Sequence, residues 1–320
     1  MRKAHDPLRP PLSRREVLTG VGLLAAGTVF KARSSVAQPV EVPPPFTDVV
    51  DCHIHLWAAD KKQFPFHANA PYVPDYVSTL EQWLADRTAS GVGIGIFVHG
   101  EPYQDDHRYV VHCLEQAPDL LRGTVLCNPN LPETPRRMTD LVRGRPFVAA
   151  RVHATSTQKS YFPEWRSRNF EKFWETVGEL GLVLQMHMHP EWSWELERLV
   201  KTYPGVRVVI DHLGRPRQGH SVDYEVTLRL SAYPNVYMKV SSLAGQSGEV
   251  SPWPNLKPLV KEIARRFTPA RMVWADSFRG GIGAAEYAQA ILDTSHLLDF
   301  LSPEEQRQIF VDTPRRLFRL

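Results

Sequence analysis

The stretch Val49-Val50-Asp51-Cys52-His53-Ile54-His55 decides the fold of this chain and points to its chemistry. Its apolar start predicts a β-strand, in which successive side chains point to opposite faces. Asp51, His53 and His55 are then expected on one face, and the even-numbered residues on the other. Two imidazoles on one face can bind a single divalent ion. A bare His-x-His is also common as a solvated or core pair, so the interpretation depends on the rest of the chain.

After this strand, short apolar runs alternate with amphipathic stretches. The predicted strands, each with the helix that follows it, are 49–54 with 80–90, 93–98 with 106–116, 123–127 with 134–142, 147–152 with 170–180, 182–187 with 192–203, 206–211 with 222–232, 236–240 with 256–267, and 272–275 with 284–298. Eight such units in about 250 residues favour a closed (β/α)8 TIM barrel. An open doubly wound sheet is the alternative, but no glycine-rich phosphate loop follows the first strand.

A last helix is predicted from Ser302 to about residue 311, because Ser302 and Glu305 have capping-box spacing and Pro303 stands at the first helical position. We expect this helix to pack across the outside of the barrel.

Residues 1–37 are interpreted as an export signal that is removed from the mature protein. Arg14 and Arg15 precede an apolar stretch and the small residues Ser35-Val36-Ala37, an order typical of twin-arginine signal peptides. The apolar stretch is too short to span a bilayer, so no stable membrane anchor is expected. A disordered basic tail or a lipid-surface anchor is the alternative. We expect recognition by the twin-arginine export machinery, a linker over residues 38–47, a barrel domain over residues 48–320 and a periplasmic location.

The basic charge of the chain belongs to this leader. The formal net charge is +3, and removing seven Lys or Arg and two Asp or Glu within residues 1–37 leaves −2. The remainder therefore gives no reason to expect a nucleic-acid partner. Cys52, Cys113 and Cys127 have no paired spacing, so no disulfide framework is expected.

Polar residues follow the predicted strands at their C-terminal ends, where the active sites of such barrels lie. They are His53 and His55 after strand one, His187 and His189 after strand five, Asp211 and His212 after strand six, Lys239, Ser241 and Ser242 after strand seven, and Asp276 after strand eight. Any one of these could be a satisfied buried polar group. Together they predict an imidazole-rich site with a carboxylate, which suits zinc or another borderline divalent ion.

The chain resembles the amidohydrolase superfamily, in the amidohydrolase-related branch that includes sugar-lactone and pyrone-dicarboxylate lactonases. The resemblance rests on residues 50–57, 209–216, 237–241, 273–276 and 310–318, and covers roughly residue 48 to the end. It implies a TIM barrel of the metallo-dependent hydrolase type. Two positions depart from the family: Ser277-Phe278 follows Asp276 where the family has Trp-Pro, and Thr313 replaces an asparagine.

With this resemblance, His53, His55, His187 and Asp276 are predicted to bind the metal, most simply zinc, with manganese or a metal-free site as alternatives. Asp276 is also expected to take a proton from the attacking water. His212 is predicted to transfer a proton or to polarise the carbonyl. Asp211 is expected to point to the opposite face and to serve structure.

The substrate-binding residues are predicted to be Arg151, His189, Arg215 and Lys239, with Arg279 as a further candidate, since a guanidinium matches a carboxylate. His99 and His153 lie where they could reach the pocket, but neither is assigned a direct role. Residues 58–76 form a long segment that is a candidate lid.

The function expected from these features is hydrolysis of a small cyclic ester, a lactone of a sugar or dicarboxylic acid, by a metal- or Asp276-activated water. The substrate is expected to be a small anionic molecule. Two alternatives remain open at this point. One is a metal-dependent decarboxylase of a small aromatic or unsaturated acid on the same barrel, and the other is a catalytically silent periplasmic binding protein.

Overall fold

The computed structural model describes residues 45–155, 161–217, 224–276, 278, 280 and 282–320. The predicted leader, the first part of the linker, Ser277 and Arg279 lie outside these residues. Within the described ranges, no helix is both long enough and apolar enough to cross a membrane.

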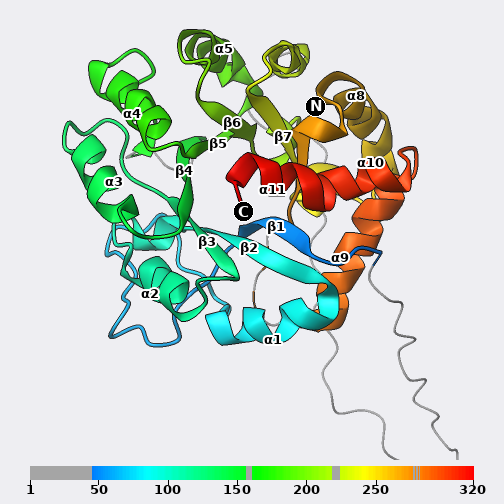
Figure 1. The fold of residues 1–320 in the computed structure, drawn as a ribbon, viewed down its shortest axis with the longest axis horizontal. Helices are drawn as coiled ribbons and strands as arrows, with labels where there is room; N and C mark the ends of the chain where they lie inside the picture. The colour runs from blue at the N-terminus through cyan, green and yellow to red at the C-terminus, as the bar shows by residue number, and fades with distance from the viewer. Residues whose placement is uncertain (1–44, 156–160, 218–223, 277, 279, 281) are drawn as a thin grey trace, which may run out of the picture. The chain divides into compact units, whose positions relative to one another are not determined.

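Eight parallel strands form one sheet in which each strand pairs with the next along the chain (Figure 1). They are β1 (Val49–Ile54), β2 (Val92–Val98), β3 (Leu121–Val125), β4 (Phe147–Ala154), β5 (Val183–Met188), β6 (Arg207–Ile210), β7 (Val236–Val240) and β8 (Met272–Trp274). The ends of the sheet meet at β8 and β1, where the peptide N–H of Asp276 donates to the Asp51 carboxylate at 3.2 Å. The predicted (β/α)8 TIM barrel is therefore confirmed.

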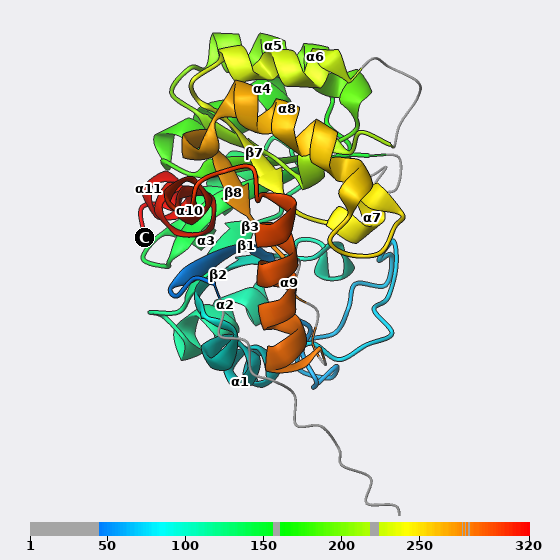
Figure 2. The same cartoon turned by 90° about the vertical axis from the view of Figure 1, so that its right-hand side faces the viewer.

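Helices follow the strands and surround the sheet (Figure 2). The α-helices are α1 (Leu80–Ser90), α2 (Arg108–Gln116), α3 (Thr134–Val142), α4 (Arg168–Glu179), α5 (Ser193–Thr202), α6 (Glu225–Leu228), α7 (Leu243–Ser247), α8 (Lys257–Phe267), α9 (Gly283–Leu297), α10 (Pro303–Arg307) and α11 (Thr313–Phe318). Short 3-10 helices include η1 (Glu101–Tyr103), directly after β2, and η4 (His212–Gly214), directly after β6. A π-helix, η8 (Gln308–Asp312), joins α10 to α11.

The apolar side chains divide into two clusters, one on each side of the strands. The larger cluster fills the space between the strands and the helices. The smaller one lies inside the barrel and contains Val50, Cys52, Ile94, Val209 and Val273. Because its members come from many different strands, this inner cluster fixes the floor on which the polar residues at the strand ends rest.

The helix predicted from Ser302 to about residue 311 packs on the outside of the barrel as expected, since Ile309, Phe310 and Val311 belong to the larger cluster. The capping box of Ser302 and Glu305 does start α10, but the chain continues into α11, whose Leu317 and Phe318 join the inner cluster. α11 thus closes the N-terminal end of the barrel, crossing the ring of strands in Figure 1 and lying opposite α7 in Figure 2. Among the described residues, α11 therefore covers the end of the barrel opposite the polar strand ends.

Candidate active site

The first strand does not keep the simple alternation expected of it. The pairing of β1 with β2 shifts register between Asp51 and Ile54, which is the mark of a bulge. Cys52 packs in the inner cluster, and His53 also faces the interior, with Nδ1 3.5 Å from the Lys239 ammonium. The Asp51 carboxylate instead accepts a hydrogen bond from Tyr287 on α9 at 2.7 Å. The expectation that Asp51 shares a face with His53 is therefore wrong, whereas His53 and His55 do come together.

The two histidines of β1 are locked in a defined orientation. The Nε2 atoms of His53 and His55 lie 3.0 Å apart. His55 donates its Nδ1–H to the carbonyl oxygen of Val98 at 2.9 Å, because a carbonyl can only accept, and its Nε2 therefore carries a lone pair. Two ligands of one tetrahedral zinc ion would lie roughly 3.3 Å apart, so the spacing of these nitrogens is close to what a shared ion requires.

At the end of β6, both Asp211 and His212 face the interior. Val209 belongs to the inner cluster, so alternation places Asp211 inside and should place His212 outside. The backbone of His212, however, has a positive φ of 56°, which ends the strand and turns the imidazole inward. His212 Nδ1 lies 2.8 Å from the Ser241 hydroxyl, and its ring centroid lies 5.0 Å from that of His53. The prediction that Asp211 points away from the site is wrong.

Asp211 forms the charged centre of the site floor. Its Oδ1 lies 2.7 Å from the Lys239 ammonium, and its Oδ2 lies 3.0 Å from the Arg151 guanidinium. Lys239 also donates to Gln185 at 2.7 Å. Burial alone would raise the pKa of Asp211, but the charges of Lys239 and Arg151 hold that pKa below its usual range. Lys239 has no exposed surface and Arg151 is 4% exposed. Both residues were predicted to bind the substrate, but each is paired with Asp211 instead.

The imidazoles around this floor are neutral at pH 7. Burial, with the nearby charge of Arg151, lowers the pKa of His55 to about 3. Burial likewise lowers the pKa of His212 to about 3, although Asp211 opposes the shift. The pKa values of His53 and His187 lie well below the usual range for the same reason. Neutral rings keep a lone pair for a metal or a proton and one N–H for a substrate oxygen.

His187 lies on the other side of the site, in contact with residues of two further loops. Its ring centroid is 5.2 Å from that of His212. Its Nδ1 lies 3.2 Å from Nδ1 of His153, and its Nε2 contacts the guanidinium of Arg215. His153 in turn lies 3.0 Å from a carboxylate oxygen of Glu101. The structure thus brings Arg215 to the site, as predicted, and adds His153 and Glu101.

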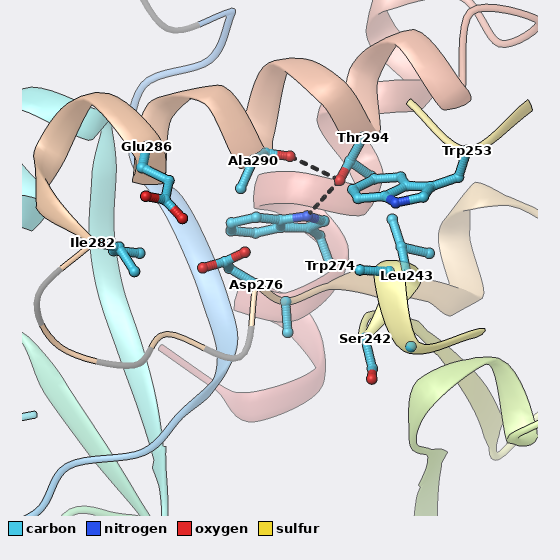
Figure 3. Close-up of a pocket in the computed structure, with 12 residues that line it drawn as sticks. Ser242, Leu243, Trp253, Trp274, Asp276, Ile282, Glu286, Ala290 and Thr294 are labelled. Carbon is cyan, nitrogen blue, oxygen red and sulfur yellow. Dashed lines mark hydrogen bonds between the residues drawn. The ribbon is translucent and has the colours of Figure 1, made fainter. Parts of the chain in front are cut away.

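Asp276 lines a cavity of about 380 Å³ between the end of β8 and α9. Figure 3 shows its carboxylate between the ring of Trp274 and the side chain of Glu286. Trp274 packs outside the barrel and Ala275 inside it, so alternation turns Asp276 outward again. Among the described residues, the lining of this cavity includes Ser242 and Trp253 but none of the four site histidines. The metal-binding role of Asp276 stays a prediction that this placement does not support.

The remaining predicted residues lie at the rim or beyond it. His189 follows β5, with Nδ1 3.8 Å from Glu191. His99 is buried away from the centre, where its ring stacks on that of His107 at 4.2 Å. The candidate lid is anchored at its base, because the Trp57 N–H donates to the carbonyl of Ser78 at 2.6 Å. Its role as a lid stays a prediction.

One group of residues has the donor atoms that a metal ion needs. Within the described ranges, His53, Asp211 and His212 form one such group, because their ligand atoms all lie within 4.8 Å of one another. Two imidazole nitrogens and a carboxylate oxygen are the donors that zinc prefers. The donor set therefore fits a borderline divalent ion, although Lys239 and Arg151 place two positive charges beside it. The carboxylate of this group is that of Asp211, whereas the predicted carboxylate ligand was Asp276.

Sequence reasoning missed Glu101 and assigned no role to His153. Both stand at the C-terminal ends of strands, Glu101 on η1 after β2 and His153 at the end of β4. The other site residues were predicted because they follow the C-terminal end of a strand. The same criterion applies to Glu101 in His99-Gly100-Glu101.

Comparison with known proteins gives relatives along almost the whole barrel. The chain is 25% identical over 279 residues to a 4-sulfomuconolactone hydrolase of Hydrogenophaga intermedia, covering 84% of this chain and 88% of the relative. It is 23% identical over 284 residues to an L-fucono-1,5-lactonase of Burkholderia ambifaria, covering 85% of this chain and 95% of the relative. Both relatives are named as enzymes that act on lactones.

The fold is also found among solved structures. A zinc-bound amidohydrolase of Burkholderia multivorans superposes with a TM-score of 0.66 at 14% identity, covering 85% of this chain and 99% of that chain. At this identity the likeness concerns the fold alone. The Amidohydrolase family model matches residues 50–320. The chain belongs to the amidohydrolase family.

Proposed function

We propose that this protein is a hydrolase that opens a small cyclic ester, a lactone of a sugar acid or a dicarboxylic acid, by attack of water on the ring carbonyl. The observation that carries the proposal is the convergence of neutral His53, His187 and His212 with Arg215 at the open end of the barrel. Lactone opening needs a proton acceptor for water and donors for the developing oxyanion. The relatives that act on lactones support the same reaction class.

The substrate is proposed to be anionic and to be oriented by Arg215. Arg151 and Lys239 each form an ion pair with Asp211. We therefore assign them to the structure of the site floor and not to binding of a substrate carboxylate. The guanidinium of Arg215 contacts His187 in the site, and its buried Nε has no hydrogen-bond partner among the described residues. A guanidinium in this position can orient a carboxylate or a carbonyl oxygen.

The proposed cofactor is one divalent ion, zinc by donor type, held by His53, Asp211 and His212. When bound, such an ion lowers the pKa of a water molecule and polarises a carbonyl. Because Lys239 and Arg151 lie beside Asp211, we expect the ion to be readily removed by chelators. Proton acceptance by Asp276 stays a prediction, because its carboxylate lines the cavity beside β8, which none of the site histidines line.

The test is proton release from a panel of sugar lactones, dicarboxylic lactones and small aromatic acids, with product masses measured in water enriched in ¹⁸O. We expect gain of one water, with the label in the new carboxylate, and no release of CO2. Arg215→Met should raise KM for anionic lactones, whereas Arg145→Met, at an exposed position beyond the site, is the matched control. Release of CO2 would instead identify a decarboxylase, and tight ligand binding without turnover would identify a binding protein.

A further inference from the structure

The carboxyl group of Asp51 is buried and joins three separate elements of the barrel. It has no exposed surface. Its Oδ1 accepts from the backbone N–H of His53 at 3.0 Å and from that of Asp276 at 3.2 Å, and its Oδ2 accepts from the Tyr287 hydroxyl at 2.7 Å. In the described part of the chain its partners are thus three hydrogen-bond donors, without an ammonium or a guanidinium. The group therefore serves as an acceptor for donors that come from β1, β8 and α9.

The bulge in β1 directs this side chain away from the barrel interior. The register of β1 against β2 shifts between Asp51 and Ile54, and a bulge both frees backbone groups from the ladder and re-aims side chains. The freed N–H of His53 needs an acceptor, and Asp51 provides it through a contact two residues along the chain that aspartate favours. The imidazole of His53 stays inside, with Nδ1 3.5 Å from the Lys239 ammonium.

The seam between β8 and β1 depends on the same oxygen atom. Among the described residues, the sheet runs in order from β1 to β8 without a paired register between these two end strands. One backbone bond crosses the seam, from the His55 N–H to the Phe278 carbonyl at 3.2 Å. The N–H of Asp276 donates to Asp51 Oδ1 instead of to a strand. A single oxygen thus fixes the backbone at the ends of two strands that bear predicted site residues.

Tyr287 holds the second oxygen and so sets the plane of the carboxyl group. It lies on α9, has no exposed surface, and its ring packs on that of Phe278 with centroids 5.0 Å apart. With Oδ2 held by this hydroxyl, Oδ1 faces the two N–H groups. Protonation of Asp51 would leave this role intact, because a neutral carboxyl group keeps a carbonyl oxygen that accepts.

We propose that Asp51 is a positioning residue that holds the backbone of His53 and Asp276 in one arrangement across the seam, and that the bulge in β1 serves to aim it there. Asp51 acts through these two residues and contacts neither a substrate nor a metal. Its effect on catalysis rests on the proposed function, in which His53 is one of the converging imidazoles. A displacement of about 1 Å in such a site can lower a rate roughly 100-fold.

The direct test is hydrogen exchange of the His53 and Asp276 amides in heavy water, followed by ¹H–¹⁵N spectra of the whole protein. Asp51→Ala removes all three hydrogen bonds, and we expect both amides to exchange roughly tenfold faster or more. Tyr287→Phe is the matched control, because it removes only the bond to Oδ2 and should keep both amides protected. The Gly123 amide of β3, which is hydrogen-bonded away from the seam, should not change in either variant.

Kinetics on the lactone panel give the second readout. Asp51→Ala should lower kcat roughly 10- to 100-fold, with KM nearly unchanged because Asp51 does not touch the substrate. Asp51→Asn should restore most of kcat, since its carbonyl oxygen accepts from the same two N–H groups and its amide can donate to Tyr287. Tyr287→Phe should keep most of kcat even where its melting temperature falls as far as that of Asp51→Ala. A purely structural role predicts instead that kcat follows the fraction of folded protein in every variant.

If Asp51→Ala does not fold, Asp51→Ser takes its place. Its hydroxyl is one atom shorter and can still bond the N–H of His53 locally, so exchange should rise more at the Asp276 amide than at the His53 amide, and kcat should fall. Unchanged exchange of both amides in these variants would overturn the positioning role. So would an unchanged kcat in Asp51→Ala or Asp51→Ser, or an equal loss of kcat in Tyr287→Phe. The expected changes in exchange, in a protein that opens no lactone of the panel, would keep the positioning role and reject the proposed function.

Discussion

The ammonium of Lys239 and the carboxylate of Asp211 lie 2.7 Å apart, and neither side chain has any exposed surface. The pair joins β7 to the end of β6 at the floor of the site. Removing one member of a buried ion pair leaves the other charge uncompensated, which typically costs about 3–5 kcal/mol. We therefore expect Lys239→Met to lower the free energy of unfolding by roughly that amount, measured by urea denaturation.

The double variant Asp211→Asn with Lys239→Met is the control for this prediction. It removes both charges, so it should be more stable than the sum of the two single changes implies. Strict additivity of the single effects would contradict the view that these groups stabilise each other.

Metal content should separate the three donor residues from Asp276. We expect His53→Ala and His212→Asn to reduce bound metal strongly, because each removes one donor from a set of three. Asp276→Asn should keep the metal, because Asp276 lines the cavity beside β8, which none of the three donor residues line. Elemental analysis of protein purified without chelator measures this. Loss of metal in Asp276→Asn, with retention in His212→Asn, would restore the ligand set predicted from the sequence.

Gly100 is expected to be indispensable for a local steric reason. A Cβ at this position would lie 2.3 Å from Cη2 of Trp57, and Trp57 is buried and stacks on His55 with ring centroids 5.4 Å apart. Gly100→Ala should therefore destabilise the protein by about 1–3 kcal/mol and lower activity by moving His55. Gly205→Ala is the control, because a Cβ added there would have no neighbouring atom within 4 Å. Equal melting temperatures for the two variants would refute this account.

The thiols should be unreactive in the folded protein. Cys52, Cys113 and Cys127 are buried and free, and burial raises the pKa values of Cys113 and Cys127 to about 12. The thiolate is the reactive form, so a chromogenic disulfide reagent should titrate no thiol in the native protein and all three in denaturant. Rapid labelling of the native protein would show that at least one of these sites opens readily.

Export is proposed from the leader, which lies outside the described residues. The twin arginines Arg14 and Arg15, followed by an apolar stretch, predict folded export to the periplasm. Replacing both with Lys should leave the full-length chain in the cytoplasm, as seen by fractionation and mass measurement of the N-terminus. Normal periplasmic recovery of that variant would reject the twin-arginine route.

The sequence by itself determined the barrel and most of the side chains at its open end. Periodicity identified all eight strands, with β1 and β7 at their observed bounds, because burial on both faces demands short apolar runs. The position of polar residues after those runs selected His53, His55, His187 and His212, because strand ends meet at one rim of a parallel barrel.

Tertiary structure decided where those side chains point and which groups they meet. The bulge in β1 and the positive φ of His212 break the period-two rule, so Asp51 turns outward while Asp211 and His212 both turn inward. The partners of Asp211 come from β4 and β7, and those of His187 come from the ends of β4 and β6. Such contacts depend on backbone irregularities and on residues that lie far apart in the sequence. Neither can be predicted from the spacing of residues within one segment.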